Sequence, residues 1–474
     1  MYVAKTAAAF GFLLLANAAE ARAAGDATAL VEALQQATGA GVLVTHGEIV
    51  DDPRTGEGTI HELRIGRAPM ILDIGEVRIA GMQMADNGDI AAIGSLSLDD
   101  VDIATGADSR VTIHDLELSD LDVAALAELL ENGMTHELAG RFDMGSAVGH
   151  GIALRVDDLF ATMDRMTSRG IVAGRLSNLD LERMMIEDAG HGASISLRQL
   201  VASGLSLDRL VQHGKLVEGR DEQAVFDADL YRDAVFAGLP SSIIATDLSA
   251  DGPNGRLTLP GLRFESHRDG EHGVVETVSA ESIEIHDFDA TAAIGGAAPG
   301  MAAPNGPWRS SLSGEMRTDM RDFETEGTLA LRAEGMGALD VAFSGSGLAF
   351  LDAGAAGLPP AMLSGLMIDY EDRGLVAESI DGMASAMGMD RNAFAFQIAT
   401  FARMFLAGAG TSPRIGNALR AIEEFVASPE RFVITLDPPE PMALDGIERR
   451  PYQLDDIAPL LDQWGVEITA GPRD

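Results

Sequence analysis

The sequence contains no cysteine, and this absence sets the first limit on its chemistry. Disulfide bonds, thiolate nucleophiles and cysteine-ligated metals are excluded together. The folded chain must therefore be stabilised by the burial of apolar side chains. An exported protein of this size without disulfides is ordinary for a bacterium and less so for a eukaryote.

Lysine is almost as scarce, because Lys5 and Lys215 are the only two in the chain. Arginine supplies the remaining positive charge, which together with abundant Ala and Gly is typical of a GC-rich bacterial genome. Acidic residues outnumber basic ones by 74 to 34, which gives a formal net charge of −40. Such a surface repels nucleic acid and anionic membranes, so we expect neither as a partner. A well-solvated surface is the simplest interpretation, and calcium binding by these acids is the alternative.

Long apolar runs are also missing. The run Ala7 to Ala16 follows Lys5 and precedes the small-residue site Ala21 to Ala23, a pattern typical of a secretory signal peptide cleaved before Ala24. This run is too short to span a bilayer, which takes about twenty residues. We therefore expect residues 1–23 to be a signal peptide and the mature protein, without a transmembrane helix, to be periplasmic or secreted. A retained N-terminal anchor is the alternative, and a lipoprotein anchor is excluded because no cysteine follows the cleavage site.

One apolar pattern, with spacings of two, three and two residues, occurs three times between Val77 and Val123. Its members are Val77, Ile79, Met82 and Met84, then Leu96, Leu98, Val101 and Ile103, then Leu116, Leu118, Leu121 and Val123. A spacing of two keeps side chains on one face of a strand, whereas a single step of three would turn the second pair to the other face. A bulge that places two residues opposite one, or a tight bend, restores the facing. The pattern therefore predicts bent antiparallel strands.

The same pattern returns later in the chain, which is typical of an extended, layered sheet. It recurs near residues 176–181, 195–200, 257–264 and 283–288. A chain of 474 residues exceeds the size of a single compact core. The predicted fold class is α+β, mostly curved antiparallel β-sheet with bulged repeat strands and a C-terminal helical cap.

The organisation that we predict has four parts after the signal peptide. Residues 24–290 form a β-rich repeat region with short helices, 291–307 an Ala/Gly/Pro-rich linker or loop, 308–372 the closing strands, and 373–474 a helical C-terminal region with a short strand. The helices predicted before residue 290 are Asp26 to Ala37 with Asp26 as its cap, Ala124 to Leu130, Leu159 to Met166 and Gln223 to Ala237. Weak alternation over His136 to Arg155 predicts a strand.

The C-terminal region has two apolar stripes at helical spacing. They are Val376, Ile380, Met383 and Met387, ended by Gly388, and Phe394, Ile398, Phe401 and Phe405, with Asp390 as the N-cap of the second helix. A third helix is expected near Ile415 to Val426, a strand at Phe432 to Leu436, and a short helix near Ile457 to Trp464. We interpret the stripes as core, with a soft, Met-lined binding groove as the alternative.

Histidines and carboxylates come together in several places without a recognisable catalytic pattern. His114-Asp115 and His286-Asp287 lie in predicted strands, where adjacent side chains point to opposite faces, so neither pair forms a catalytic dyad by itself. We interpret these histidines as surface residues. His150 and His191 are predicted in loops, where a metal site could use them only with ligands from distant segments.

The acidic clusters lack the spacing of a calcium loop, and we interpret them as the polar face of bent strands. They are Asp99, Asp100 and Asp102, then Asp120 and Asp122, then Asp157 and Asp158. The G-x-S-x-G elbow and the phosphate-binding loop are both absent, and Gly345-Ser346-Gly347 is interpreted as a turn. We therefore assign no catalytic, cofactor-binding or metal-ligating residue and expect no cofactor.

The repeated pattern, exemplified by Leu96, Leu98, Val101 and Ile103, resembles the β-repeats of AsmA-like bacterial envelope proteins over residues 40–370. That resemblance implies a curved sheet with an elongated groove associated with lipid movement or outer-membrane upkeep. The chain differs in lacking a conventional membrane anchor. The segment Leu366 to Leu375, with Pro438 to Pro441, is also similar to the ends of uncharacterised exported alphaproteobacterial proteins.

These observations predict a non-enzymatic periplasmic envelope protein that holds a lipid acyl chain or another envelope component on an apolar sheet face. The alternative is a structural or protein-interaction module with a fully covered core. A hydrolase without a recognisable motif is the third possibility. The sequence does not specify the oligomeric state. Whether the apolar pattern faces a filled core or an open trough distinguishes the first two hypotheses.

Overall fold

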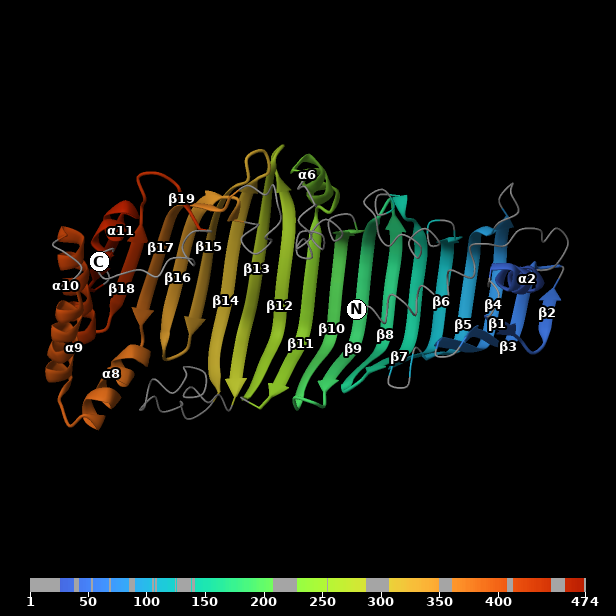
Figure 1. The fold of residues 1–474 in the computed structure, drawn as a ribbon, viewed down its shortest axis with the longest axis horizontal. Coiled ribbons are helices and arrows are strands. Elements are labelled where there is room, and N and C mark those ends of the chain that lie inside the picture. Colours follow the sequence, from blue (N-terminus) through green and yellow to red (C-terminus); the bar gives the residue numbers. More distant parts are fainter. Residues whose placement is uncertain are drawn as a thin grey trace. The chain divides into compact units, whose positions relative to one another are not determined.

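The computed structural model is dominated by antiparallel strands (Figure 1). It describes residues 26–37, 42–52, 54–67, 70–84, 90–104, 106, 109–123, 125, 138, 141–207, 228–253, 255–286, 307–348, 360–406, 412–444 and 457–472. The predicted signal peptide and nearly all of the predicted linker at 291–307 lie outside these residues, as does most of the predicted helix at Ala124 to Leu130. No helix in these ranges has the length and apolarity needed to cross a membrane.

The chain divides into two compact units, the first formed by residues 1–215 and 227–253, the second by residues 216–226 and 254–474. The strands of the first unit are β1 (Leu43–Thr45), β2 (Ile49–Asp52), β3 (Glu57–Arg67), β4 (Met70–Met84), β5 (Ile90–Ala104), β6 (Ser109–Asp122), β7 (Met144–Val156), β8 (Leu159–Val172), β9 (Arg175–Asp188), β10 (Ala193–Ser206) and β11 (Ser241–Gly252). From β3 to β11 each strand pairs antiparallel with the next, and β1 and β2 both pair with β3.

Two rows of kink residues, defined here as strand residues with φ between +47° and +69°, cross this first sheet. In the first row they lie on the odd-numbered strands from β3 to β11, at Glu62, Asp100, Gly151, Arg183 and Asp247. In the second row they lie on the even-numbered strands from β4 to β10, at Gly81, Asp120, Gly170 and Gly204. Seven of the nine kink residues fall between apolar residues three positions apart, and Gly151 and Gly170 fall at the equivalent three-residue step of their strands. The left-handed conformation there turns the strand back to its original facing.

The strands remain in register across these kinks. Leu98 pairs with Leu116, and three residues along each strand Val101 pairs with Ile113, so Asp100 lies opposite a single residue of β6. The predicted tight bend is confirmed at these kinks, whereas the predicted bulge is found elsewhere, between β4 and β5, where the register shifts between Gln83 and Met84. No bulge forms at the kinks because the three-residue steps of the two neighbouring strands lie opposite each other. The side chains of both strands therefore change face at the same point, and no residue is left unpaired.

Constant register aligns the apolar residues into rows that run across the strands. One row has nine members, one from each strand from β3 to β11: Leu63, Ile74, Val101, Ile113, Ile152, Met163, Met184, Leu197 and Leu248. The apolar pattern of the sequence therefore becomes one continuous apolar sheet face.

Helix α2 (Asp26–Ala37) fills the core at the β3 end of this face. Leu30 and Leu34 are buried there against Ile60, Val77 and Ile79. The helix has the predicted bounds, but its first amides are capped by another residue. Asp51 of β2 accepts from the N–H of Ala27 at 2.9 Å, whereas Asp26 accepts from the N–H of Met82 at 3.1 Å. The apolar pattern that begins at Val77 thus faces a filled core.

The second unit contains a further run of antiparallel strands, which we call the second sheet. Its strands are β12 (Gly255–Asp269), β13 (Gly273–His286), β14 (Trp308–Asp319), β15 (Glu324–Ala333), β16 (Gly337–Ser346), β17 (Met362–Asp372), β18 (Arg431–Leu436), β19 (Met442–Ala443) and β20 (Val466–Ala470). Consecutive strands pair from β12 to β18, β20 pairs with β18, and β19 pairs with β17. This sheet also has register shifts, one between Ala280 and Ile283 and one between Ser344 and Gly345.

The helices of the chain agree in part with the sequence predictions. Helices α8 (Leu375–Ala386), α9 (Arg391–Leu406), α10 (Pro413–Ala427) and α11 (Ile457–Gln463) lie where helices were predicted, and α6 (Ala228–Ala237) confirms the described part of the prediction at 223–237. The predicted helix at Leu159 to Met166 is wrong, because these residues belong to strand β8. The strand predicted over 136–155 is confirmed only from Met144 onward, as β7 (Met144–Val156), because Leu138 and Arg141 are helical.

Candidate functional site

The two faces of the second sheet differ in chemistry because side chains alternate along each strand. On β15, Leu329 and Leu331 share one face, with Thr328 and Ala330 on the other. The in-register neighbours of Leu329 are Gly314 and Val341, whereas those of Thr328 are Glu315 and Ala342. One face is therefore apolar and the other largely polar.

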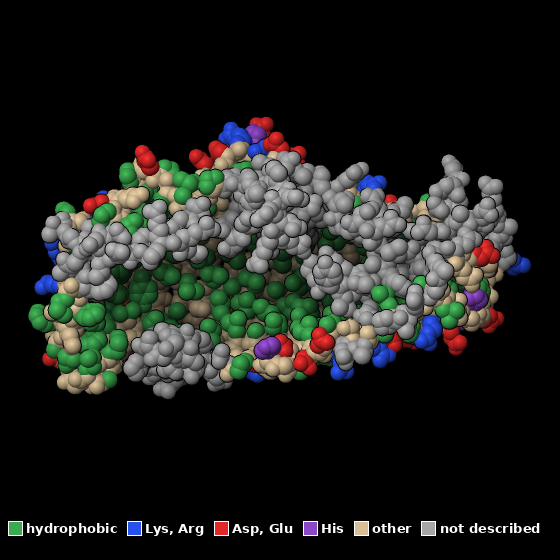
Figure 2. Space-filling model, viewed as in Figure 1, with side chains coloured by type: hydrophobic (Ala, Val, Ile, Leu, Met, Phe, Trp, Pro, Cys, Tyr) green, Lys and Arg blue, Asp and Glu red, His purple; other side chains and the backbone are tan. Residues whose placement is uncertain are grey.

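Three in-register rows make up the apolar face, which we call the apolar floor. The rows are Leu312, Leu331, Leu339, Tyr370 and Phe432; Gly314, Leu329, Val341, Ile368 and Ile434; and Met316, Gly327, Phe343, Leu366 and Leu436. Figure 2 shows hydrophobic side chains gathered in a hollow over the strands of this unit.

The floor is covered at one end by helix α10. Phe425 of α10 packs on Phe432, with ring centroids 5.0 Å apart, and edge-on against Tyr370 at 6.2 Å. Burial, reinforced by the hydrogen bond that the Tyr370 hydroxyl donates to Asp372 at 2.8 Å, raises the pKa of Tyr370 well above its usual value. Tyr370 is therefore a neutral part of a packed aromatic cluster.

Away from α10 the floor is accessible. Leu329 is 38% exposed and Leu331 is 37% exposed, although both point to the apolar side of the sheet. By contrast, Val77 and Ile79 on the apolar face of the first unit are each 1% exposed beneath α2. Large aliphatic side chains with this exposure, aligned across neighbouring strands, form a surface that gains free energy when an apolar ligand covers it.

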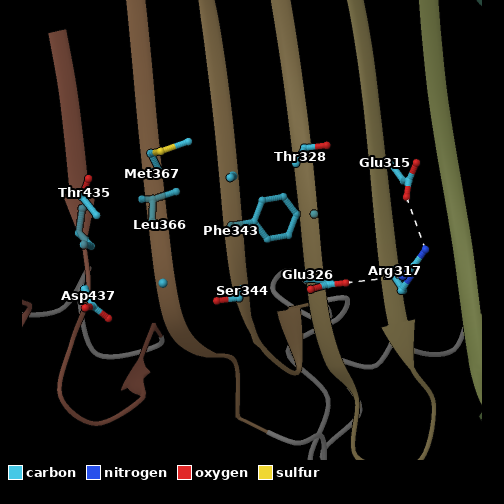
Figure 3. A pocket seen from close by; sticks show the side chains of 14 residues that line it. Glu315, Arg317, Glu326, Thr328, Phe343, Ser344, Leu366, Met367, Thr435 and Asp437 are labelled. Carbon is cyan, nitrogen blue, oxygen red and sulfur yellow. Dashed lines mark ion pairs between the residues drawn. The ribbon is translucent and has the colours of Figure 1, made fainter. Parts of the chain in front are cut away.

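A hollow of about 600 Å³ lies on the same strands, lined by apolar side chains such as Phe343, Leu366 and Met367 and by charged side chains at its edge (Figure 3). Three small residues, Gly327, Ala342 and Gly365, also line it. Arg317 lies at its edge and is shared by Glu315 and Glu326, each 3.9 Å away. Its Nε also lies 3.3 Å from Asp269. Three carboxylates around one guanidinium leave this hollow with excess negative charge, so it disfavours anionic ligands.

The histidines singled out in the sequence are spread over separate places. His114 is exposed, as predicted, and its Nδ1 lies 2.9 Å from Asp100 on the neighbouring strand rather than contacting Asp115. His286 pairs with Glu284 at 3.3 Å. His114 and Asp115 therefore do not form a dyad, whereas Asp287 lies outside the described residues.

The other two histidines differ in how well they were predicted. His191 lies in the turn between β9 and β10, 2.8 Å from Asp188, as expected for a loop residue. His150 was wrongly placed in a loop, because it lies within β7 opposite Asp115. Among the described residues, no three His, Asp or Glu side chains are grouped so that they could hold a metal ion.

The acidic clusters lie on strands and turns with local partners. Asp100 and Asp120 are kink residues, and Asp99 accepts a hydrogen bond from Arg78 at 2.6 Å. Burial raises the pKa of Asp99, and the nearby guanidinium opposes that shift. Asp157 and Asp158 form the turn between β7 and β8 and so lie outside the strands in which they were predicted.

The exposed side of helix α9 is a feature that the sequence interpretation missed. Phe394 is buried and Ile398 is partly buried, as predicted for a core stripe. Phe401 was assigned to the same stripe, but it is 67% exposed. Met387, the last member of the α8 stripe, is also largely exposed. The side chain of Phe405 lies outside the described part of the chain. The even distribution of apolar residues around α9 was the available signal, because such a helix has more apolar surface than one core contact covers.

A family model described as "Uncharacterized protein" matches residues 330–471, from the end of β15 to β20. This is less than half of the chain and includes most of the apolar floor together with helices α8 to α11. No curated protein and no solved structure matches the chain.

Proposed function

We propose that this protein is a non-enzymatic component of a bacterial envelope that holds the acyl chain of a lipid on the apolar floor of its second unit. The observation that carries the proposal is the exposure of Leu329 and Leu331 within aligned apolar rows. The side chains of these rows are almost entirely hydrocarbon. They therefore suit a ligand that is recognised by its apolar area rather than by its charge.

The dimensions of the floor support an extended apolar ligand. Neighbouring strands are about 4.8 Å apart, so the four strands from β14 to β17 give the floor a width of about 14 Å. Each methylene group removed from water contributes about 0.8 kcal/mol, so a chain lying along one row gains several kcal/mol without a polar contact. The AsmA-like pattern of the sequence and the signal-like N-terminus support an envelope location.

In this proposal the C-terminal helices act as a cap that closes one end of the floor. The packing of Phe425 on Phe432 supports this role, because it covers the β18 side and leaves Leu329 and Leu331 accessible. The buried cluster of Ile380, Ala384 and Phe394 joins α8 to α9. A ligand would then enter from the side of the floor away from α10.

The second candidate is an interaction module with a covered core. The burial of Leu30 and Leu34 of α2 against the first sheet favours it, because that part of the apolar face has no room for a ligand. The two candidates make different predictions for the second unit, since a covered core needs no external apolar ligand.

Two adjacent residues of β15 provide a matched test. Leu329→Gln places an amide on the floor, whereas Thr328→Gln places the same amide on the opposite face. We expect the full chain to bind a fluorescent fatty acid, Leu329→Gln to weaken binding about tenfold, and Thr328→Gln to leave it unchanged. Tenfold corresponds to about 1.4 kcal/mol. Thermal unfolding of both variants checks that the fold is retained.

Native mass spectrometry of the protein purified from its own envelope supplies the independent measurement. A stoichiometric lipid that is lost in Leu329→Gln would support the proposed function. A bare polypeptide mass, together with equal probe binding by the two variants, would contradict it and favour the interaction module.

A further inference from the structure

Helix α9 has an exposed apolar patch formed by Phe396, Phe401 and Met404. These side chains are 71%, 67% and 66% exposed, the highest values among the large apolar residues that the structure describes. Within one helix, positions 396, 401 and 404 fall on the same side, because they lie within about 140° of each other around the axis. Ala395 and Ala399, on the opposite side of α9, are buried, and so is Phe394 in its first turn.

The patch is held on a fixed support. Arg391 at the first turn of α9 forms an ion pair with Asp381 of α8, and Arg403 near its end pairs with Glu423 of α10. Together with the buried side of the helix, these contacts fix which side of α9 faces outward. The exposed apolar residues are therefore presented together.

The charge of α9 distinguishes it from the rest of the chain. Its 16 residues include no Asp or Glu, although the whole chain has 74 acidic residues. Gln397 and Thr400, which lie between the three apolar residues around the helix, are uncharged. An uncharged apolar face is compatible with the interfacial region of a bilayer, from which an acidic face would be excluded.

The area of the patch also favours a bilayer over a protein. A Phe or Met side chain has about 200 Å², so the three exposed fractions sum to about 400 Å². A stable protein interface needs about 800 Å² on each partner. Insertion of two phenylalanines into the acyl boundary needs no complementary protein surface.

We propose that this patch docks the protein on a lipid bilayer by inserting Phe396, Phe401 and Met404 among the lipids. The docking is apolar and does not require that the floor bind an acyl chain. Because the chain as a whole is acidic, neutral phosphatidylcholine vesicles are the preferred surface, and adding anionic phosphatidylglycerol weakens binding.

Vesicle flotation with the full chain tests this proposal. We expect flotation with phosphatidylcholine vesicles and at least a tenfold loss of partitioning in the triple variant Phe396→Ser, Phe401→Ser, Met404→Ser. Since all three side chains are exposed, the variant should keep its thermal midpoint. It should also retain fatty-acid binding, while Leu329→Gln retains flotation, so that the two proposals can fail separately.

An isosteric pair of variants gives the matched control. Gln397→Glu adds one negative charge within the patch and should reduce flotation, whereas Asn417→Asp adds the same charge at an exposed position of α10 and should not. Equal flotation of the triple variant and the unmodified chain would overturn the proposal. A change of oligomeric mass in the triple variant without any change in flotation would also overturn it and assign the patch to a second copy of the chain.

Discussion

At the scale of single residues, the left-handed backbone conformation of the kinks is adopted by two kinds of residue, glycine and non-glycine residues such as aspartate. Gly81 and Gly151 adopt the left-handed conformation without a steric penalty, whereas Asp100 and Asp120 are among the side chains that tolerate it best. Arg183 has no such advantage and is held by an ion pair with Asp164 at 2.6 Å. The kinks are thus maintained by the sheet around them as well as by local preference.

Gly204 is the kink residue most sensitive to substitution. A Cβ there would lie 1.9 Å from the carbonyl oxygen of Pro240, so Gly204→Ala requires a backbone shift in addition to a strained φ angle. We expect this variant to lower the free energy of unfolding by about 3 kcal/mol. Urea denaturation followed by circular dichroism measures the change.

Gly192 provides the control for that prediction. Its φ is +62°, close to the +68° of Gly204, but a Cβ there would meet no atom of the described chain within 4 Å. Gly192→Ala should therefore cost about 1 kcal/mol, from backbone strain alone. Equal losses in the two variants would show that the contact with Pro240 has no effect.

At the scale of elements, Asp372 connects the sheet to the first C-terminal helix. Its carboxylate accepts from the N–H groups of Val376 at 2.8 Å and Ala377 at 3.1 Å, and from the hydroxyl of Tyr370. These amides belong to the first turn of α8, which has no side-chain cap from Gly374. Asp372 therefore caps α8 from the end of β17.

Asp372→Ala should lower the free energy of unfolding by about 1–2 kcal/mol, because it leaves two helix amides without their acceptor and removes the shorter hydrogen bond of the Tyr370 hydroxyl. Hydrogen exchange should become faster at the start of α8. Asp381→Ala, which removes a surface ion pair on the same helix, should cost less than about 1 kcal/mol. Unchanged exchange in Asp372→Ala would rule out the capping role.

Local patterns of the sequence predicted many helices and strands. They failed where an apolar spacing of three residues fits both a helix and the bent strands of this sheet. Helix α2 was predicted with its full bounds because its apolar spacing and the following Gly39 agree. The segment 159–166 was misassigned because Met163 and Met166 are three residues apart, as on a helix. In β8 this interval is the three-residue spacing of the two-three-two apolar pattern. The first and last positions of the pattern here are Ala161 and Ser168, which are too weakly apolar for the pattern to be recognised in the sequence.

The candidate site could be predicted only in part. The apolar character of Leu329, Leu331 and Val341 was visible as strand spacing, but their exposure depends on which distant segments cover them. The same limit applies to Phe401, whose helical spacing from Phe394 and Ile398 indicated a core position. Burial is set by tertiary packing, and one amphipathic pattern is compatible with a filled core, as at Val77, or with an open face, as at Leu329.

At the scale of the whole molecule, the formal charge of −40 opposes the folded state through self-repulsion. The ion pairs described above are mostly exposed and offset little of it. We expect the thermal midpoint to rise by about 3 °C or more between about 0.01 M and about 0.3 M sodium chloride, as the Debye length shortens. Differential scanning calorimetry measures this, and a midpoint that falls with salt would show that attractive pairs dominate.

The alternation of the kink residues between neighbouring strands restricts how the number of strands in the first sheet can change. Odd-numbered strands have their left-handed residue in one row and even-numbered strands have theirs in the other. Removing a single strand would place two strands of the same kind side by side, whereas removing a hairpin of two preserves the alternation. A sheet of this design can therefore change length during evolution in steps of one hairpin, which makes its length a modular property.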